Sequence, residues 1–196
     1  MLTRLTVLLS LLFIISIAAL THVAYAQTQK LPKTKLAFDL PGADWSLADS
    51  MKTKTGMRIY SYKRAPITDS EGRNIIPNIA CLIEKVPKET DIVEYSAEKR
   101  GQVPFDVKEV YSSLDSNAVI HHPYAVAYKG TYTRDDLEHT VYVVHLIDEN
   151  WGVQIICDAT TEVFPICQPE FLKFLRSIRS SAKSNRTMEQ HTVEEK

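Results

Sequence analysis

Three stretches rich in β-branched and aromatic residues follow one another late in the chain, and they constrain the fold more than any other feature. They cover residues 123–133, 140–148 and 151–159, with short polar turns between them. Strands so closely spaced can pair only as an antiparallel meander, because parallel pairing needs a long crossover. Gly130, inside the first stretch, indicates a bulge or a close backbone approach. The run "PEFLKFLRSIRS" that follows predicts an amphipathic helix to cover the sheet, with this apolar stripe: Phe171, Phe174, Leu175 and Ile178.

Further strands and a second helix are predicted upstream. Residues 57–64 alternate with a period of two, and residues 78–86 form a nearly continuous apolar run, typical of a strand buried on both faces. Residues 90–101 follow a helical pattern, which Thr90 would cap and Gly101 would end. The inward stripe expected for this helix is Ile92, Val93 and Ala97.

The order of these elements, together with the phrases "LPGADW" and "FLKFLRSIR", resembles the Mog1/PsbP-like family over residues 36–180. The resemblance implies an α+β fold, in which a central antiparallel sheet is covered by helices as an α/β/α sandwich. It also implies protein binding rather than catalysis. It transfers no functional residue, since no binding motif of the family is matched, and a fold alone does not specify a function.

The two ends of the chain differ from its middle. Residues 1–26 combine Arg4, an uncharged apolar run and the small-residue pattern Ala24-Tyr25-Ala26, which predicts a secretory signal peptide. We therefore expect an exported protein, periplasmic or extracellular, with no membrane insertion after cleavage. Residues 27–35 are expected to form a flexible segment, residues 36–180 a single domain, and residues 181–196 a disordered polar tail. The net charge of −1 argues against nucleic acid as a partner.

The chain has three cysteines, and an oxidising compartment would favour a disulfide between two of them. Cys157 lies near the end of a predicted strand and Cys167 on the approach to the last helix, so Cys157–Cys167 is the expected pair. Pairing of Cys81 with either of them stays open. Cys81 itself lies in an apolar strand, where a free thiol behaves as a small hydrophobe.

An acidic turn offers the clearest candidate metal ligands. Asp135, Asp136, Glu138 and His139 are carboxylates and an imidazole within one predicted hairpin, and such groups suit a divalent cation. The alternative is a solvated turn, because adjacent acidic residues are common in turns. No other cofactor is predicted; a divalent metal at this turn is the only one considered.

The missing catalytic motifs favour a non-enzymatic domain that binds a still unidentified protein partner or assists assembly. A candidate surface combines residues of types frequent in binding hot spots: Trp45, Tyr60, Tyr62 and Arg64. The alternative is that these side chains pack under a helix. Two other functions are kept open: a metal-dependent or hydrolytic exported protein that uses the histidine and the acidic turn, and a small-ligand carrier.

Overall fold

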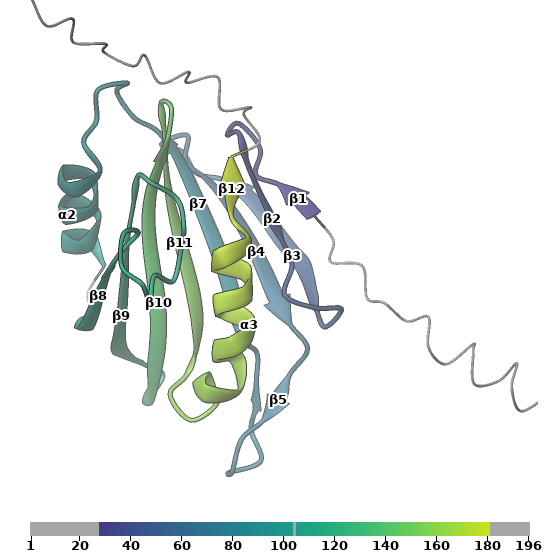
Figure 1. Cartoon of the computed structure of the whole chain (residues 1–196). Helices are drawn as coiled ribbons and strands as arrows, with labels where there is room; N and C mark the ends of the chain where they lie inside the picture. Colours follow the sequence, from purple (N-terminus) through teal and green to yellow (C-terminus); the bar gives the residue numbers. More distant parts are fainter. Residues whose placement is uncertain (1–27, 104, 181–196) are drawn as a thin grey trace, which may run out of the picture.

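The computed structural model describes residues 28–103 and 105–180, and an antiparallel sheet of seven strands forms the centre of this part (Figure 1). The strand order is β3-β4-β7-β11-β10-β9-β8. The strands span β3 Trp45–Lys52, β4 Arg58–Arg64, β7 Asn78–Lys85, β8 Asp106–Ser112, β9 Ala125–Arg134, β10 Leu137–Asp148 and β11 Trp151–Thr160. The predicted meander is confirmed as β9, β10 and β11. The run 78–86 is confirmed as strand β7, but its burial alternates along the strand, so only one face is fully buried rather than both.

Two small sheets accompany the large one. Strand β2 (Leu36–Asp39) pairs with β1 (Thr28–Lys30) on one side and with β12 (Arg179–Ser180) on the other, and β5 (Ile67–Thr68) pairs with β6 (Asn74–Ile75). The N-terminal segment thus differs from the flexible one expected for residues 27–35. Strand β1 hydrogen-bonds to β2, and Leu31 is only 2% exposed in the main core. Residues 1–27 and 181–196, which include the predicted signal peptide and polar tail, lie outside the described residues.

The turn between β9 and β10 explains the register of the meander. Asp135 and Asp136 both have positive φ, 52° and 61°, and they join strands whose flanking residues Arg134 and Leu137 are paired. A two-residue turn of this kind matches the twist of a hairpin, and aspartate tolerates the left-handed conformation. Its register places Tyr142, Val144 and Leu146 on one face of β10, and Val141, Val143 and His145 on the other.

Gly130 lies at the close approach that its position in the sequence indicated. A Cβ atom there would come within 2.4 Å of the carbonyl oxygen of Asp106 and 2.6 Å of the Phe105 ring. The adjacent strand β8 shifts register between Val107 and Glu109, as expected for a bulge. The absence of a side chain at Gly130 therefore lets β8 join the edge of the sheet.

Replacing Gly130 with alanine is expected to lower the free energy of unfolding by about 1–3 kcal/mol, because the added methyl group meets the Asp106 backbone carbonyl as well as the Phe105 ring, and the backbone cannot move aside without shifting β8. Urea unfolding monitored by circular dichroism measures the effect. Gly42→Ala is the matched control, since a Cβ at Gly42 meets nothing within 4 Å. Equal unfolding midpoints for the two variants would contradict the close approach.

Helix α3 (Phe164–Ser177) covers one face of the sheet. Its stripe of Phe171, Phe174 and Leu175 is fully buried, as the helical spacing predicted, and the Phe174 ring meets the Phe38 ring edge-on. The helix begins five residues earlier than expected, because Pro165 occupies its first turn, where a missing N–H does no harm. This helix joins β2 and β11 through the main core.

Helix α2 (Ile92–Gln102) packs on the opposite face, but with a different side inward than expected. Its buried residues are Tyr95, Ser96 and Lys99, while Val93 is 65% exposed. The prediction of an apolar inward stripe was therefore wrong. The cap also differs: the Asp91 carboxylate accepts hydrogen bonds from the amides of Val93 and Glu94. The face of β10 beneath α2 carries polar groups, so a polar helix face is what fits there.

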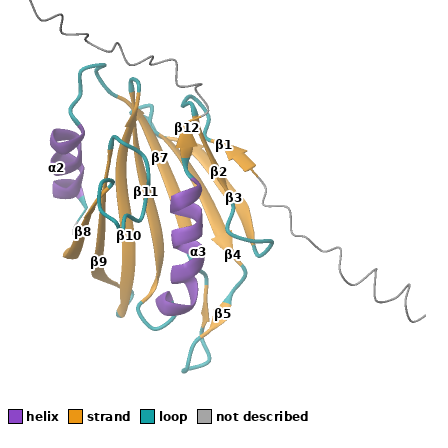
Figure 2. Cartoon of the chain, viewed as in Figure 1, coloured by secondary structure: helices purple, strands orange, loops and turns teal. Residues whose placement is uncertain are grey.

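The described chain is thus α+β, mostly antiparallel sheet with two helices (Figure 2). The two helices cover different amounts of the sheet. Helix α3 lies along the middle of its face, over the main core, whereas α2 packs mainly on β9 and β10, and its Tyr95 and Lys99 side chains reach Glu84 of β7.

Candidate functional site

The surface predicted around Trp45, Tyr60, Tyr62 and Arg64 is not available for binding. Trp45 is 4% exposed and Tyr62 is 3% exposed, and both belong to the main core. Tyr60 packs against the same core and is half-buried. The structure thus supports the alternative weighed from the sequence, in which these aromatic side chains pack beneath a helix and contribute to stability.

Arg64 has a structural partner of its own. Its Nε lies 2.9 Å from Glu170 Oε2 on α3, and the Trp45 indole donates to the same oxygen at 2.7 Å. Burial raises the pKa of Glu170, but the hydrogen bonds from Arg64 and Trp45 outweigh burial, so the pKa is lowered overall. These contacts fix the first turns of α3 to strands β3 and β4.

The four candidate metal ligands do not converge. Asp135 and Asp136 are exposed at the tip of the turn, and Glu138 is exposed as well. His139 is buried on the sheet, where its Nδ1 lies 2.9 Å from Asp158 Oδ1 and its ring stacks on Tyr132. In residues 28–103 and 105–180, no group of three or more histidine, cysteine or acidic side chains is placed to hold a metal ion.

The three cysteines are free thiols, so the structure does not contain the predicted Cys157–Cys167 disulfide. Cys167 lies inside helix α3 rather than on its approach, and Cys157 lies within β11 beside Ile79. All three side chains are 0% exposed in the main core. Burial raises the pKa of Cys167 to about 11 and that of Cys81 to about 12, which suits buried small hydrophobes rather than reactive thiolates.

A polar cluster lies between α2 and the sheet. Ser96 Oγ is 2.8 Å from His145 Nδ1 and 2.7 Å from the Tyr128 hydroxyl. The pair of hydroxyl and imidazole has the spacing of a nucleophile and its base. However, Ser96 and His145 are each 1% exposed, so a substrate has no route to the hydroxyl in this arrangement. The cluster is therefore a structural contact that holds α2 to β9 and β10.

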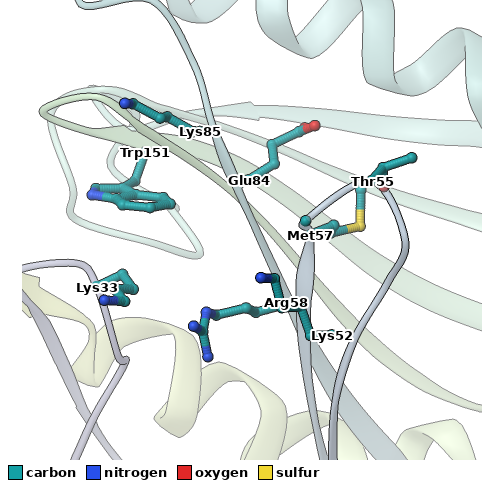
Figure 3. Close-up of a pocket in the computed structure, with 9 residues that line it drawn as sticks. Lys33, Lys52, Thr55, Met57, Arg58, Glu84, Lys85 and Trp151 are labelled. Atoms are coloured by element: carbon teal, nitrogen blue, oxygen red, sulfur yellow. The ribbon is translucent and has the colours of Figure 1, made fainter.

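A cationic pocket of about 330 Å³ lies at one end of the large sheet, and sequence reasoning missed it (Figure 3). Four basic side chains line it: Lys33, Lys52, Arg58 and Lys85. The Trp151 ring and Met57 also line it, and both are half-buried. In Figure 3 the Trp151 ring lies above Lys33 and Arg58, and Lys85 lies on the other side of the ring. The pocket thus combines positive charge with an aromatic wall.

The pairing of the strands brings these residues together. Lys52 and Arg58 are cross-strand partners at the turn end of the β3–β4 hairpin, and Lys85 and Trp151 are cross-strand partners at the same end of β7 and β11. The hairpin closes through Gly56, whose φ is +90° and whose amide donates to the Thr53 carbonyl at 3.1 Å. Four strand ends therefore surround the pocket.

Lys33 enters the pocket from a different segment. It lies in the turn between β1 and β2 with φ 77°. The adjacent Lys35 ties this turn to the turn between β10 and β11, since its amide donates to Asp148 and its ammonium group pairs with Glu149. The sequence could have shown that Lys52, Arg58 and Lys85 share a strand end, but no local signal connects Lys33 to them.

The charge of the pocket is not neutralised from within. Lys33, Lys52, Arg58 and Lys85 form no ion pair with other described residues. One carboxylate lines the pocket, Glu84, but its Oε1 already accepts Lys99 Nζ at 2.8 Å and the Tyr95 hydroxyl at 3.0 Å. Ammonium and guanidinium groups donate to phosphate and carboxylate oxygens. The arrangement is suited to holding an anion.

Comparison with known proteins identifies the fold. No protein-family model matches the sequence, and no curated protein matches it. Among solved structures, LpqN of Mycobacterium tuberculosis, described as involved in cell envelope biogenesis, is similar with a TM-score of 0.51 and 13% identity, over 79% of this chain and 90% of that one. PsbP (CyanoP) of Synechocystis sp. PCC 6803 has a TM-score of 0.46 and 10% identity, over 82% of this chain and 95% of that one. The chain has a Mog1/PsbP-like fold, as its sequence indicated.

Proposed function

We propose that this chain is an exported, non-enzymatic accessory domain that acts by binding, and that its cationic pocket holds an anionic group of the partner. The observation that carries the proposal is that four basic side chains line one pocket and form no ion pair with other described residues. The proposal includes removal of residues 1–26 on export. The involvement of LpqN in cell envelope biogenesis is consistent with such a role, although the similarity concerns the fold alone.

We also propose that the fold is the α/β/α sandwich implied by the resemblance. The positions of α2 and α3 on opposite faces of the sheet support this. A binding role agrees with the chemistry of the pocket. Its lining offers cationic donors and an aromatic wall, whereas the hydroxyl–imidazole contact of Ser96 and His145 is sealed beneath α2. A protein partner would have to present acidic side chains to the pocket.

The expected affinity is modest and depends on salt. Exposed ion pairs each contribute about 0.2–1 kcal/mol, so four cations that converge on one group give binding on the order of millimolar for a small anion. The Debye length shortens from about 10 Å at 0.1 M salt to about 3 Å at 1 M, so binding weakens as salt is added. A partner that also contacts Trp151 would bind more tightly.

The test is a titration with pyrophosphate, monitored by the fluorescence of Trp151. The double substitution of Lys52→Glu and Arg58→Glu is expected to weaken binding at least tenfold, because two attractive charges become repulsive. Lys63→Glu is the matched control: Lys63 is exposed on the same strand β4 as Arg58, but at the opposite end. Equal binding by the wild type and the double variant would refute the proposal.

A further inference from the structure

The basic side chains extend beyond the pocket. Lys54 is exposed in the turn of the β3–β4 hairpin, and Lys88 is exposed in the segment after β7. Together with the four basic side chains of the pocket they form what we term the basic end, which consists of Lys33, Lys52, Lys54, Arg58, Lys85 and Lys88. None of these six residues forms an ion pair within the described chain.

Most acidic side chains near the basic end are already engaged. Glu84 holds Lys99 and Tyr95, while Asp148 and Glu149 hold the turn that carries Lys35. Glu89, next to Lys88, is exposed and without an ion pair. The basic end therefore has a clear excess of positive charge, although the whole chain has a net charge of −1.

The number and spread of these cations indicate several anionic groups rather than one. A single phosphate offers too few oxygen atoms for six basic side chains from three separate segments. Long lysine stems at an open pocket also lack the rigid fork that selects one small anion. An array of phosphate groups on one surface satisfies such a set more fully than a free phosphate does.

The apolar residues of the basic end indicate which kind of anionic array fits it. The half-buried Trp151 ring forms a wall of the pocket, and Met57 lines it from the hairpin. Tryptophan favours the boundary between lipid headgroups and hydrocarbon, where its ring meets an apolar phase and its N–H a polar one. A bilayer has such a phase behind its phosphates, whereas an acidic peptide or a polyphosphate chain does not.

We propose that the basic end docks this domain on a bilayer of anionic phospholipids, with a headgroup phosphate in the cationic pocket and Trp151 at the headgroup boundary. This inference rests on the proposed function, because it identifies the bilayer as the partner that presents the anionic group. Docking is peripheral. Among the described residues, no helix is long and apolar enough to cross a membrane.

Co-sedimentation with vesicles tests the proposal. The full chain is expected to bind mixed phosphatidylglycerol–phosphatidylcholine vesicles more strongly than phosphatidylcholine vesicles, and high salt should remove the difference. Each lysine or arginine near such a surface changes affinity about fivefold, so the Lys52→Glu, Arg58→Glu double variant should bind mixed vesicles at least twentyfold more weakly. Lys63→Glu serves as the control, because it is the same kind of charge reversal away from the basic end.

The readout is the difference in affinity between the mixed vesicles and the phosphatidylcholine vesicles. Any binding through the apolar residues 1–26 would contribute to both affinities. A shift of Trp151 fluorescence to shorter wavelength on mixed vesicles is also expected, and Trp151→Phe should remove it. This second readout reports entry of the ring into a less polar phase, which charge attraction alone would not produce.

Three other outcomes would overturn the inference. If pyrophosphate binds at the pocket but the two vesicle types bind equally, the proposed function stands and the bilayer inference fails. If poly-glutamate binds more tightly than mixed vesicles in a manner that needs Arg58, the partner is an acidic protein surface. If neither pyrophosphate nor vesicles respond to the double substitution, both proposals fail.

Discussion

Replacing Phe171 with alanine is expected to lower the free energy of unfolding by about 3–5 kcal/mol, the range for deleting a buried phenylalanine. Its side chain is 0% exposed, and its ring centroid lies 5.8 Å from that of Trp45 and 5.7 Å from that of Phe164. The loss combines the apolar surface that is no longer buried with the cavity that remains. Chemical denaturation of both proteins gives the difference.

A residue on the same helix supplies the control. Ile166 is 59% exposed, so Ile166→Ala should change the free energy of unfolding by less than about 0.5 kcal/mol. If both substitutions had the same small effect, α3 would not be the cover of the main core. If Ile166→Ala alone were severe, the orientation of the helix would be wrong.

The second large effect is a loss of stability in acid through His145. Burial, together with the positive charge of Lys99, lowers the pKa of His145 from its ordinary value of 6.5 to about 4. Between these pH values the unfolded chain binds a proton that the folded chain does not. The free energy of unfolding is therefore fully maintained above pH 6.5 and falls by about 3 kcal/mol as the pH drops to 4.

The structure gives the reason for this depressed pKa. The His145 ring is enclosed by Tyr95 and Ser96 of α2 and by Tyr128 of β9, and Lys99 also lies on α2. The Nε2 atom of His145 has no hydrogen-bond partner in the described chain. A second proton on the ring would place a charge in an enclosed site without a carboxylate to pair with it. Protonation should thus loosen α2 before the rest of the fold.

Unfolding measured at several pH values checks this prediction, with His145→Asn as the test variant. The slope of stability against pH between 6.5 and 4 should be smaller in the variant than in the wild type. His121→Asn is the control, because His121 is exposed and its replacement should leave the slope unchanged. An identical slope in the His145 variant would show that another group, such as His122, whose pKa is also lowered mainly by burial, causes the acid sensitivity.

The sheet could be predicted from the sequence because its signals are local. The run of β-branched and aromatic residues in 140–148, the short turns on either side of it and the apolar stripe of the last helix each determine one element. The close approach at Gly130 followed from the same reasoning. The inward face of α2 was mispredicted because an apolar stripe was assumed, whereas the sheet beneath it presents His145 and Tyr128, which require polar partners such as Ser96.

The candidate site could not be predicted for a different reason. Tyr60, Tyr62 and Trp45 have the composition of a binding surface, but burial depends on the position of α3 and β2 above them, which is a tertiary property. The pocket depends on pairs far apart in sequence, such as Lys85 with Trp151 and Lys52 with Arg58. Isolated lysines at strand ends are common, so their meeting at one pocket becomes visible only in the fold.

The most direct test of the central claim is to map where an anion binds. Amide and indole NMR signals of the nitrogen-15-labelled protein would be recorded during a titration with pyrophosphate. We predict shifts concentrated at Lys33, residues 52–58, Lys85 and the indole of Trp151, with the indole of the buried Trp45 unchanged as an internal reference. Shifts scattered over the surface, or centred on another part of the chain, would contradict the claim that the cationic pocket is the binding site.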